Sequence, residues 1–253
     1  MRAIAVLAVA SLVFPLAGCV KRQVMGGKAL RLPMQPGETV TNPADGAVLV
    51  PVPPDGSGEK KNSGPGFWIY RNEVTVAQYR KFCEKTGCRM PEEPPWGWKD
   101  DEPVVNVNGR DAFNYARWAG VRLPTESEWQ SAARGGPDAG FPWESEWDAS
   151  KCANHLTSPG KPAPVGSFPG GRSPAGCDDM AGNVAEWVLM DDPTGKPPSS
   201  RFDRKAVFLV KGGSWINESA DRFKVDDRPD YAWGSRALDR GFRCAVPAYQ
   251  AAK

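Results

Sequence analysis

Hydrophobic and polar residues follow two different periods along this chain, and each period predicts a different kind of element. The short apolar runs Val48–Val52 and Phe67–Tyr70 are bounded by Gly, Pro and Asn, which is typical of strands. From Val76 to about Lys85 the apolar positions instead recur on one helix face, between Thr75 as the N-cap and Gly87 as the stop. The pattern therefore predicts strands and helices mixed along the chain.

Two further helices are expected downstream. One runs from about Arg110 to Ala119 and ends at Gly120. The other begins at a capping box, in which the side chains of Thr125 and Glu128 each bond the other residue's backbone amide, and it ends at Arg134. Since helix mechanics account for the acidic residues of its first turn, we assign them no chemistry.

The rest of the chain is expected to form short strands and turns, and the stretch 176–187 joins a polar turn to a buried strand. Gly182 and Asn183 tolerate positive φ angles, and the carboxylate of Glu186 lies next to the apolar Trp187. A carboxylate in this setting has two sensible roles. It joins the carbonyl oxygens of the turn around a cation such as calcium, or it accepts backbone N–H bonds and holds the loop.

Composition describes a protein rich in loops. The chain holds 27 Gly, 25 Pro and 10 Trp, which is typical of a compact domain pinned by large aromatic side chains and not of a helical bundle. The 32 basic residues nearly balance the 30 acidic ones. The net charge of +2 therefore predicts no nucleic-acid partner and no polybasic membrane patch.

The first residues predict export. Arg2 precedes an apolar run, Ala3–Leu16, that is too short to span a membrane, and Leu16-Ala17-Gly18-Cys19 follows. This looks like a bacterial lipoprotein signal in which Cys19 is lipidated and attaches the protein to a membrane. The alternative is a plain signal peptide with a chance cysteine. Val20 in place of an aspartate favours the outer membrane by analogy with enteric sorting rules, so we expect a lipid-anchored protein of the bacterial cell envelope, facing the periplasm.

The cysteines allow few disulfides. Once Cys19 carries lipid, five remain: Cys83, Cys88, Cys152, Cys177 and Cys244. Disulfides persist in exported proteins, and an odd number permits at most two bridges within the chain. We expect Cys83 and Cys88 to close a small loop at a helix end, with Cys152 and Cys177 as a second pair. None of the spacings fits a Cys-x-x-Cys redox motif or a zinc site.

Five short motifs occur in a characteristic order. They are Glu73-Val74-Thr75, Arg122-Leu123-Pro124-Thr125-Glu126-Ser127-Glu128-Trp129, Asp179-Met180-Ala181-Gly182-Asn183-Val184-Ala185-Glu186-Trp187, Gly212-Gly213-Ser214-Trp215 and Gly241-Phe242-Arg243. Together they resemble the formylglycine-generating-enzyme (sulfatase-modifying factor) family, over about Phe67 to Val246. The resemblance implies an α+β, C-type-lectin-like fold with few helices, short strands and much irregular structure. We expect a signal peptide (1–18), a lipidated cysteine and tether (19–43), one such domain (44–248) and a tail (249–253).

The resemblance also implies a structural calcium site at the Gly-Asn turn. Its ligands are the backbones of Ala181, Gly182 and Val184 and the carboxylate of Glu186. The family's other calcium site begins at an Asn that Asn154 matches. The loop that follows is short and lacks the downstream Asp, so we expect this second site to be lost.

Copper binding is where the chain departs from the family. The resemblance implies a pair of cysteines that bind copper(I) and convert a substrate cysteine to formylglycine. Asn217 and Arg222 stand at those two positions, and neither an amide nor a guanidinium replaces the soft thiolates that hold copper(I). We therefore expect no copper and no formylglycine-generating activity.

Other chemistry has few candidates. His155, the single histidine, is expected in a loop, and the chain builds neither a Ser-His-Asp triad nor a histidine metal site. Ser214, Glu218 and Asp239 are the candidates for catalysis, because a carboxylate on a partly dry cleft floor acts as a general acid or base. The alternative for Glu218 is an exposed loop residue.

Two functions of different classes remain open. The first is a non-catalytic, lipid-anchored recognition module that binds an envelope protein, for example in a secretion system. The second is a divergent, cysteine-independent envelope enzyme acting on a small metabolite or peptide, similar to the oxidase-like relatives in siderophore maturation. Trp and Arg dominate binding hot spots. The residues that we expect at the cleft or interface are Trp187, Trp215, Asn217, Arg222, Trp233 and Arg236.

Overall fold

The structure is a computed structural model, and it describes residues 32–33, 39–53, 66–134, 138–144, 146–193, 202, 206–229 and 231–249. The predicted signal peptide, the predicted lipidation site Cys19 and residues 250–253 lie outside this described part. Among the described residues, none of the helices has the length and apolar character needed to cross a membrane.

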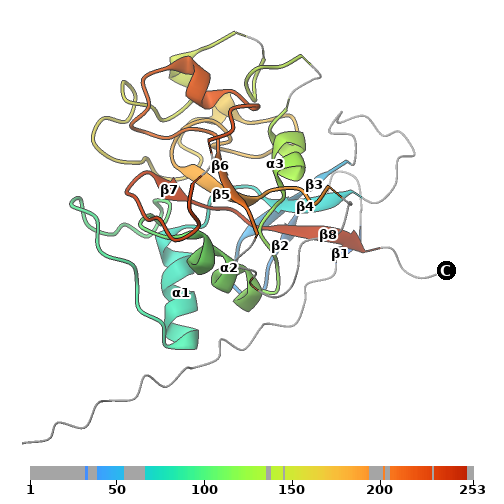
Figure 1. Ribbon diagram of the computed structural model, residues 1–253, viewed down its shortest axis with the longest axis vertical. Coiled ribbons are helices and arrows are strands. Elements are labelled where there is room, and N and C mark those ends of the chain that lie inside the picture. The colour runs from blue at the N-terminus through green and yellow to red at the C-terminus, as the bar shows by residue number, and fades with distance from the viewer. Residues whose placement is uncertain are drawn as a thin grey trace, which may run out of the picture.

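Two small sheets form the centre of the fold (Figure 1). The five-stranded sheet has the order β1-β8-β4-β3-β2 and the three-stranded sheet the order β6-β5-β7. Only β1 with β8 and β5 with β7 pair in parallel among the named strands. The strands are β1 (Leu32–Pro33), β2 (Val40–Thr41), β3 (Val48–Val52), β4 (Phe67–Tyr70), β5 (Ala185–Leu189), β6 (Phe208–Lys211), β7 (Arg240–Gly241) and β8 (Ala245–Tyr249).

The early and late parts of the chain share the larger sheet, since Trp68 of β4 pairs with Val246 of β8. Residues before position 44, where we expected the domain to begin, already take part in the larger sheet. Val40 pairs with Leu49, and the buried Asn42 donates hydrogen bonds to the Tyr70 hydroxyl and to the Ala119 carbonyl. At the other end, β8 extends one residue into the predicted tail.

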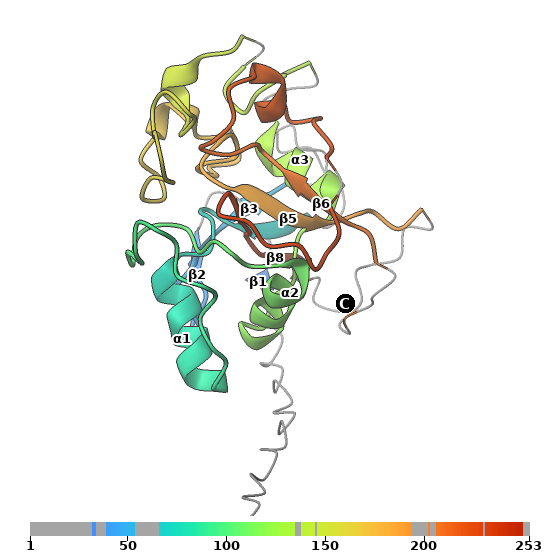
Figure 2. The ribbon, with the colours of Figure 1, turned by 60° about the vertical axis from the view of Figure 1, so that its left-hand side comes forward.

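Three α-helices cover the sheets: α1 (Val76–Thr86), α2 (Gly109–Trp118) and α3 (Glu126–Ala133). All three begin at a capping box. Gln78 completes the capping box of α1 and Asp111 that of α2, and neither residue was predicted from the sequence. In Figures 1 and 2, α1 and α2 lie side by side on one side of the sheets, and the irregular segments between α3 and β5 lie on the other. These segments include the 3-10 turns η1 (Ala149–Lys151) and η2 (Pro169–Gly171), and η3 (Ala220–Phe223) follows β6. The predicted α+β architecture is confirmed.

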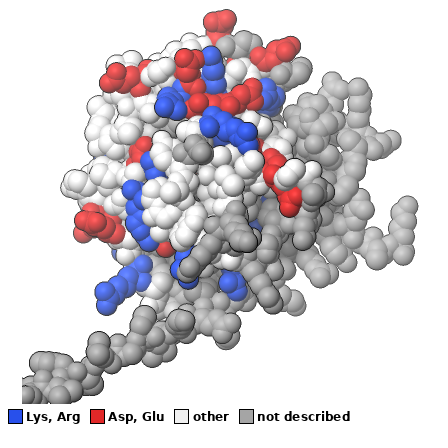
Figure 3. All heavy atoms as spheres, viewed as in Figure 1, with Lys and Arg blue, Asp and Glu red and all other residues white. Residues whose placement is uncertain are grey.

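Aromatic rings fill the space between the helices and the sheets. Tyr79 of α1 stacks on Tyr115 of α2 with ring centroids 5.7 Å apart, and Phe242 contacts both rings edge-on. Such contacts add to the stabilisation that the buried area provides. Figure 3 shows basic and acidic side chains interspersed over one face of the molecule, without a large region of one sign.

The five cysteines of the described part are thiols in this structure. Cys152 and Cys177 are both buried but belong to separate hydrophobic clusters, so the pair predicted between them is wrong. Cys83 and Cys88 are side by side, with their sulfurs 2.6 Å apart. The hydrogen bond shared with Cys83 lowers the pKa of the Cys88 thiol to about 7, which favours the thiolate that attacks in disulfide formation.

We expect mild oxidation with diamide to join Cys83 to Cys88, with loss of one hydrogen from each thiol and reduction of the diamide. Closing so short a loop stabilises the protein by about 2 kcal/mol in the chain-entropy model. Counting thiols by alkylation and mass spectrometry should show two fewer after oxidation. The Cys88→Ser variant is the control, and an unchanged thiol count in the wild type contradicts the prediction.

Candidate functional site

The third and fifth motifs meet at a buried ion pair. Parallel pairing of β5 with β7 sets Glu186 opposite Gly241, and Arg243 follows two residues later. The Nε and Nη2 atoms of Arg243 donate to the two carboxylate oxygens of Glu186 at 2.7 Å each. The indole Nε1 of Trp129 donates to Glu186 Oε2 at 2.9 Å. Both charged side chains are buried, so three segments far apart in sequence are joined by charge-assisted hydrogen bonds.

This arrangement does not support the calcium site that we expected at Glu186. The carboxylate that was to join the backbones of Ala181, Gly182 and Val184 around a cation has both oxygens taken by Arg243. Within the described residues, no group of three or more His, Cys, Asp or Glu is placed to hold a metal ion. Glu186 holds the loop, as in the alternative interpretation, but its donors are a guanidinium and an indole and not backbone N–H groups.

The turn before β5 is tied to the first motif. Glu73 accepts hydrogen bonds from the Asn183 side chain at 2.6 Å and from the Val184 backbone N–H at 3.1 Å. Burial, together with the charges of Asp179 and Glu186, raises the pKa of Glu73 well above its ordinary value. The turn has the positive φ angles that we expected, with 82° at Gly182 and 60° at Asn183.

Gly182 is required for a close approach as well as for its backbone angle. A Cβ atom there would lie 2.2 Å from the carbonyl oxygen of Ala153. The neighbouring Asn154, the candidate for the second calcium site, uses its amide within its own loop. It donates to the carbonyls of Ala149 and Cys152 and accepts from the backbone N–H groups of Leu156 and Thr157. Asn154 therefore shapes the loop against which Gly182 packs.

Two of the three catalytic candidates lie together after β6. The buried Ser214 donates its hydroxyl to Asn217 Oδ1 at 3.1 Å, and the same oxygen accepts the Ser214 backbone N–H at 2.8 Å. Asp239 Oδ2 is 3.5 Å from the Ser214 hydroxyl. Glu218 is exposed, in agreement with its interpretation as a loop residue.

His155 lies in a loop, as expected, but its contact could not be read from the sequence. Its Nδ1 is 3.1 Å from the carbonyl oxygen of Asn217, which also accepts the His155 backbone N–H. Arg222, at the second cysteine position, is exposed and reaches Asp227 at 3.5 Å. Its carbonyl oxygen would lie 2.7 Å from a Cβ atom at Gly213. Both family cysteine positions are thus part of one tightly folded loop.

The residues predicted at a cleft or interface divide into buried and accessible ones. Trp187 is fully buried and donates its indole N–H to the Val107 carbonyl at 3.0 Å, so its assignment to an interface is wrong. Trp215 is half-buried, donates to the Leu238 carbonyl at 3.2 Å, and meets Trp96 edge-on at a centroid distance of 5.6 Å. These contacts leave Trp215 accessible at the rim of the loop.

The other accessible residues lie beside α2. Trp233 is half-buried against Phe202. Arg236 is exposed, pairs with Asp111 and donates to the Asn106 carbonyl at 2.7 Å. It also lines a cavity of about 380 Å³ with Tyr79, Arg89, Met90, Pro91, Glu92 and Asp111. The Asn106 side chain bonds the Glu92 carbonyl at 3.0 Å, so the segment that carries Trp96 connects this region to Trp215.

Two exposed apolar residues next to the contact between His155 and Asn217 were missed by sequence reasoning. Leu156 is 67% exposed and Ile216 is 46% exposed. Each is adjacent in sequence to one partner of the contact between His155 and Asn217. Apolar residues in irregular segments carry no periodic signal that distinguishes an exposed side chain from a buried one.

Comparison with known proteins bears on the fold and on the motifs. The sequence model of the "Sulfatase-modifying factor enzyme 1-like domain" matches residues 32–248. The chain is 35% identical over 206 residues to a formylglycine-generating enzyme of Thermomonospora curvata, covering 71% of this chain and 64% of that protein. It is 36% identical over 158 residues to a hercynine oxygenase of Mycolicibacterium smegmatis, covering 49% of this chain and 37% of that protein. The chain thus spans less than two thirds of either relative.

Solved structures with the same fold include PvdO from Pseudomonas aeruginosa. It aligns with a TM-score of 0.63 at 25% identity and covers 85% of this chain and 100% of that one. CarF aligns with a TM-score of 0.59 at 20% identity, covering 80% of this chain and 99% of that one, a likeness of fold alone. The fold that the five motifs implied is therefore confirmed.

Proposed function

The chain belongs to the sulfatase-modifying factor enzyme 1-like family, and we propose that it serves there as a non-catalytic recognition module. In this proposal, lipid on Cys19 holds the protein in the bacterial cell envelope, on the outer membrane facing the periplasm. The domain then binds an envelope protein, as an accessory component of a secretion system or of similar machinery.

The chemistry at the two cysteine positions is the observation that carries this proposal. Asn217 offers an amide whose Oδ1 is taken by Ser214, and Arg222 offers a guanidinium next to Asp227. Neither is a ligand for a soft metal ion. A loop that is built for redox chemistry in the family is here occupied by side chains that stabilise the loop itself.

The surface around this loop suits protein binding. We call Trp96, Leu156, Trp215, Ile216 and Arg236 the loop face. It combines exposed aliphatic side chains with half-buried tryptophans and an exposed arginine, and tryptophan and arginine contribute most often to binding hot spots. The ring contact of Trp96 with Trp215 holds both aromatic side chains in place before a partner binds, which lowers the entropic cost of association.

Photo-crosslinking in intact cells tests the proposal, with the crosslinking amino acid placed at position 236. We expect reproducible capture of one envelope protein, reduced about tenfold or more by Ile216→Asp because loss of a hot spot costs about 2 kcal/mol. Arg80→Glu is the matched control, because Arg80 is an exposed arginine of α1 that pairs with Asp100 and is not part of the loop face. If capture does not exceed that of an unrelated lipoprotein, or if Ile216→Asp leaves it unchanged, the recognition module is wrong.

The second candidate is a divergent, cysteine-independent enzyme, oxidase-like and acting on a small metabolite or peptide. The names of the relatives at 35–36% identity favour it, as does the grouping of Ser214, Asn217 and Asp239. Asp239→Asn and Glu218→Gln separate the two functions. If the protein is an enzyme, a strain that carries Asp239→Asn shows the same metabolite change as a deletion strain, while partner capture is unaffected. If it is a recognition module, the Asp239→Asn strain shows no metabolite change.

A further inference from the structure

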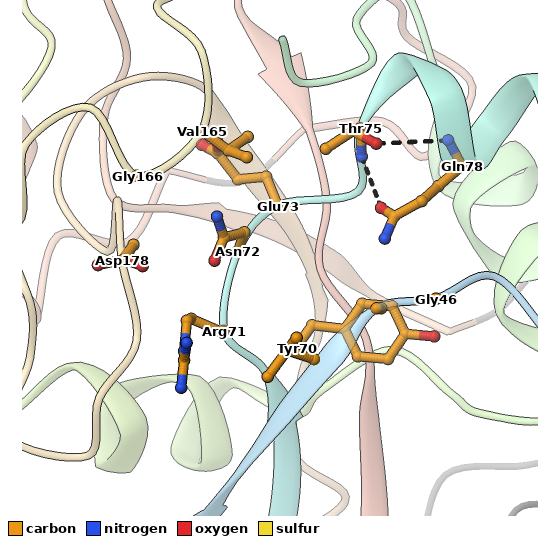
Figure 4. A pocket seen from close by; sticks show the side chains of 12 residues that line it. Gly46, Tyr70, Arg71, Asn72, Glu73, Thr75, Gln78, Val165, Gly166 and Asp178 are labelled. Carbon is orange, nitrogen blue, oxygen red and sulfur yellow. Dashed lines mark hydrogen bonds between the residues drawn. The ribbon is translucent and has the colours of Figure 1, made fainter. Parts of the chain in front are cut away.

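A cavity of about 420 Å³ lies between the end of β4, the start of α1 and the 165–166 and 178 turns (Figure 4). Its lining shares no residue with the loop face. Gly166 lines it with a φ angle of 75°, which favours glycine, and a Cβ atom there would make ordinary van der Waals contacts with Asn72 Nδ2 at 3.5 Å and Asp178 Oδ2 at 3.6 Å. The volume falls in the range of small-molecule sites.

The lining is rich in hydrogen-bond donors without partners. The Nε atom of Arg71 is buried and has no hydrogen-bond partner within the described part of the chain. The Oε1 atom of Gln78 accepts a hydrogen bond from the Thr75 backbone N–H at 2.9 Å, so the amide nitrogen of Gln78 can donate to a ligand. Asn72 adds a second amide (Figure 4). A buried donor that lacks an acceptor is unfavourable, so a ligand that supplies an acceptor gains affinity here.

The acidic groups of the lining are already engaged. Arg172 holds the Asp178 carboxylate through two hydrogen bonds, at 2.6 Å and 3.2 Å. Both oxygens of Glu73 are taken by Asn183 and Val184. Among the charged side chains that line the cavity, only the guanidinium of Arg71 has no partner among the described side chains. A single positive charge flanked by carboxylates suits a monoanion better than a dianion such as phosphate.

We propose that this cavity binds the carboxylate of a small organic acid or of a peptide C-terminus. The guanidinium of Arg71 pairs with the carboxylate in the two-pronged geometry that such groups share. The amide of Asn72, the next residue along the chain, donates to a remaining lone pair, and Gln78 lines the opposite side of the cavity (Figure 4). Both sources present the same chemistry, and the site is separate from the surface on which the recognition function rests.

The test is isothermal titration calorimetry on the purified full chain with three probe pools. The first holds acetate, butyrate, benzoate and N-acetylalanine. The second holds N-acetylated dipeptides with a free C-terminus, and the third holds the same dipeptides as C-terminal amides. We expect one or both acid pools to bind and the amides not to bind. The pool that binds more tightly identifies the source.

Two variants connect binding to the cavity. Arg71→Gln removes the charge, and Gln78→Glu adds a repelling charge while it keeps a residue that completes the capping box. We expect each to weaken binding at least tenfold, because Arg71→Gln removes hydrogen bonds from a charged donor and Gln78→Glu repels the carboxylate of the ligand. Arg80→Gln is the control and should bind as the wild type does. Circular dichroism shows that each variant is folded.

The proposal is overturned if neither acid pool binds at millimolar concentration, or if the amides bind as well as the acids. An unchanged affinity in folded Arg71→Gln and Gln78→Glu also overturns it. None of these results depends on partner capture, so they test the cavity independently of the recognition function.

Discussion

Replacing Arg243 by Met should lower the free energy of unfolding by about 3–5 kcal/mol, or prevent folding altogether. The substitution leaves the carboxylate of Glu186 buried without its counter-ion. It also removes the donors to the carbonyls of Tyr70, Arg71 and Asp178. Breaking one partner of a buried pair costs far more than the pair itself contributes, because the remaining charge cannot reach water.

Urea unfolding followed by fluorescence measures this loss. The control is Arg80→Met, since Arg80 and Asp100 form an exposed pair with side chains 44% and 72% accessible, and such pairs contribute about 1 kcal/mol or less. If Arg243→Met does not fold, Glu186→Gln tests the same pair, because it keeps an acceptor for Trp129 while it removes the charge. A loss below about 1 kcal/mol in both variants means that the pair does not hold the fold.

The same experiment examines the calcium site once more. With both Glu186 oxygens bound to Arg243, chelation by EDTA should leave the urea midpoint of the wild type unchanged. A lower midpoint after chelation, restored by calcium, contradicts the ion-pair arrangement.

The helices could be predicted from sequence because their signals are local. Thr75 and Gly87 mark the ends of α1 through angles and hydrogen bonds within a few residues, and Thr125 with Glu128 does the same for the start of α3. Resemblance to a family supplied the fold, since five motifs in order carry information that composition does not.

The partners of each motif were not predictable in the same way. Glu186 and Arg243 are 57 residues apart, and nothing near Glu186 in the sequence distinguishes a cation from a guanidinium as its partner. Trp187 has the amphipathic character of an interface residue, yet its indole N–H donates a hydrogen bond to the Val107 carbonyl in the core. The cavity beside Arg71 draws its lining from four separate segments. Such features depend on which segments the fold brings together, and a local pattern does not encode that.

The pH dependence of stability should change when Asp179 is replaced by Asn. Burial raises the pKa of Asp179 to about 6, against about 3.9 in an unfolded chain. The native state therefore holds the proton more tightly than the unfolded state. The stability that this group contributes is complete below pH 4, falls as the pH rises from about 4 to about 6, and is lost above that. A shift of about two pKa units corresponds to about 3 kcal/mol.

Asn suits this position because it tolerates the φ angle of 57° and keeps an oxygen to accept the Gly166 N–H. The charges that face Asp179 are those of Arg243, Arg172, Asp178, Glu186 and Glu73, and all five are retained in the variant. We therefore compare urea unfolding of the two proteins at pH 4 and pH 7. Between these values the wild type should lose about 2 kcal/mol relative to Asp179→Asn, because part of the shift already acts at pH 4. Parallel curves for the two proteins mean that Asp179 ionises normally and that the turn is open to water.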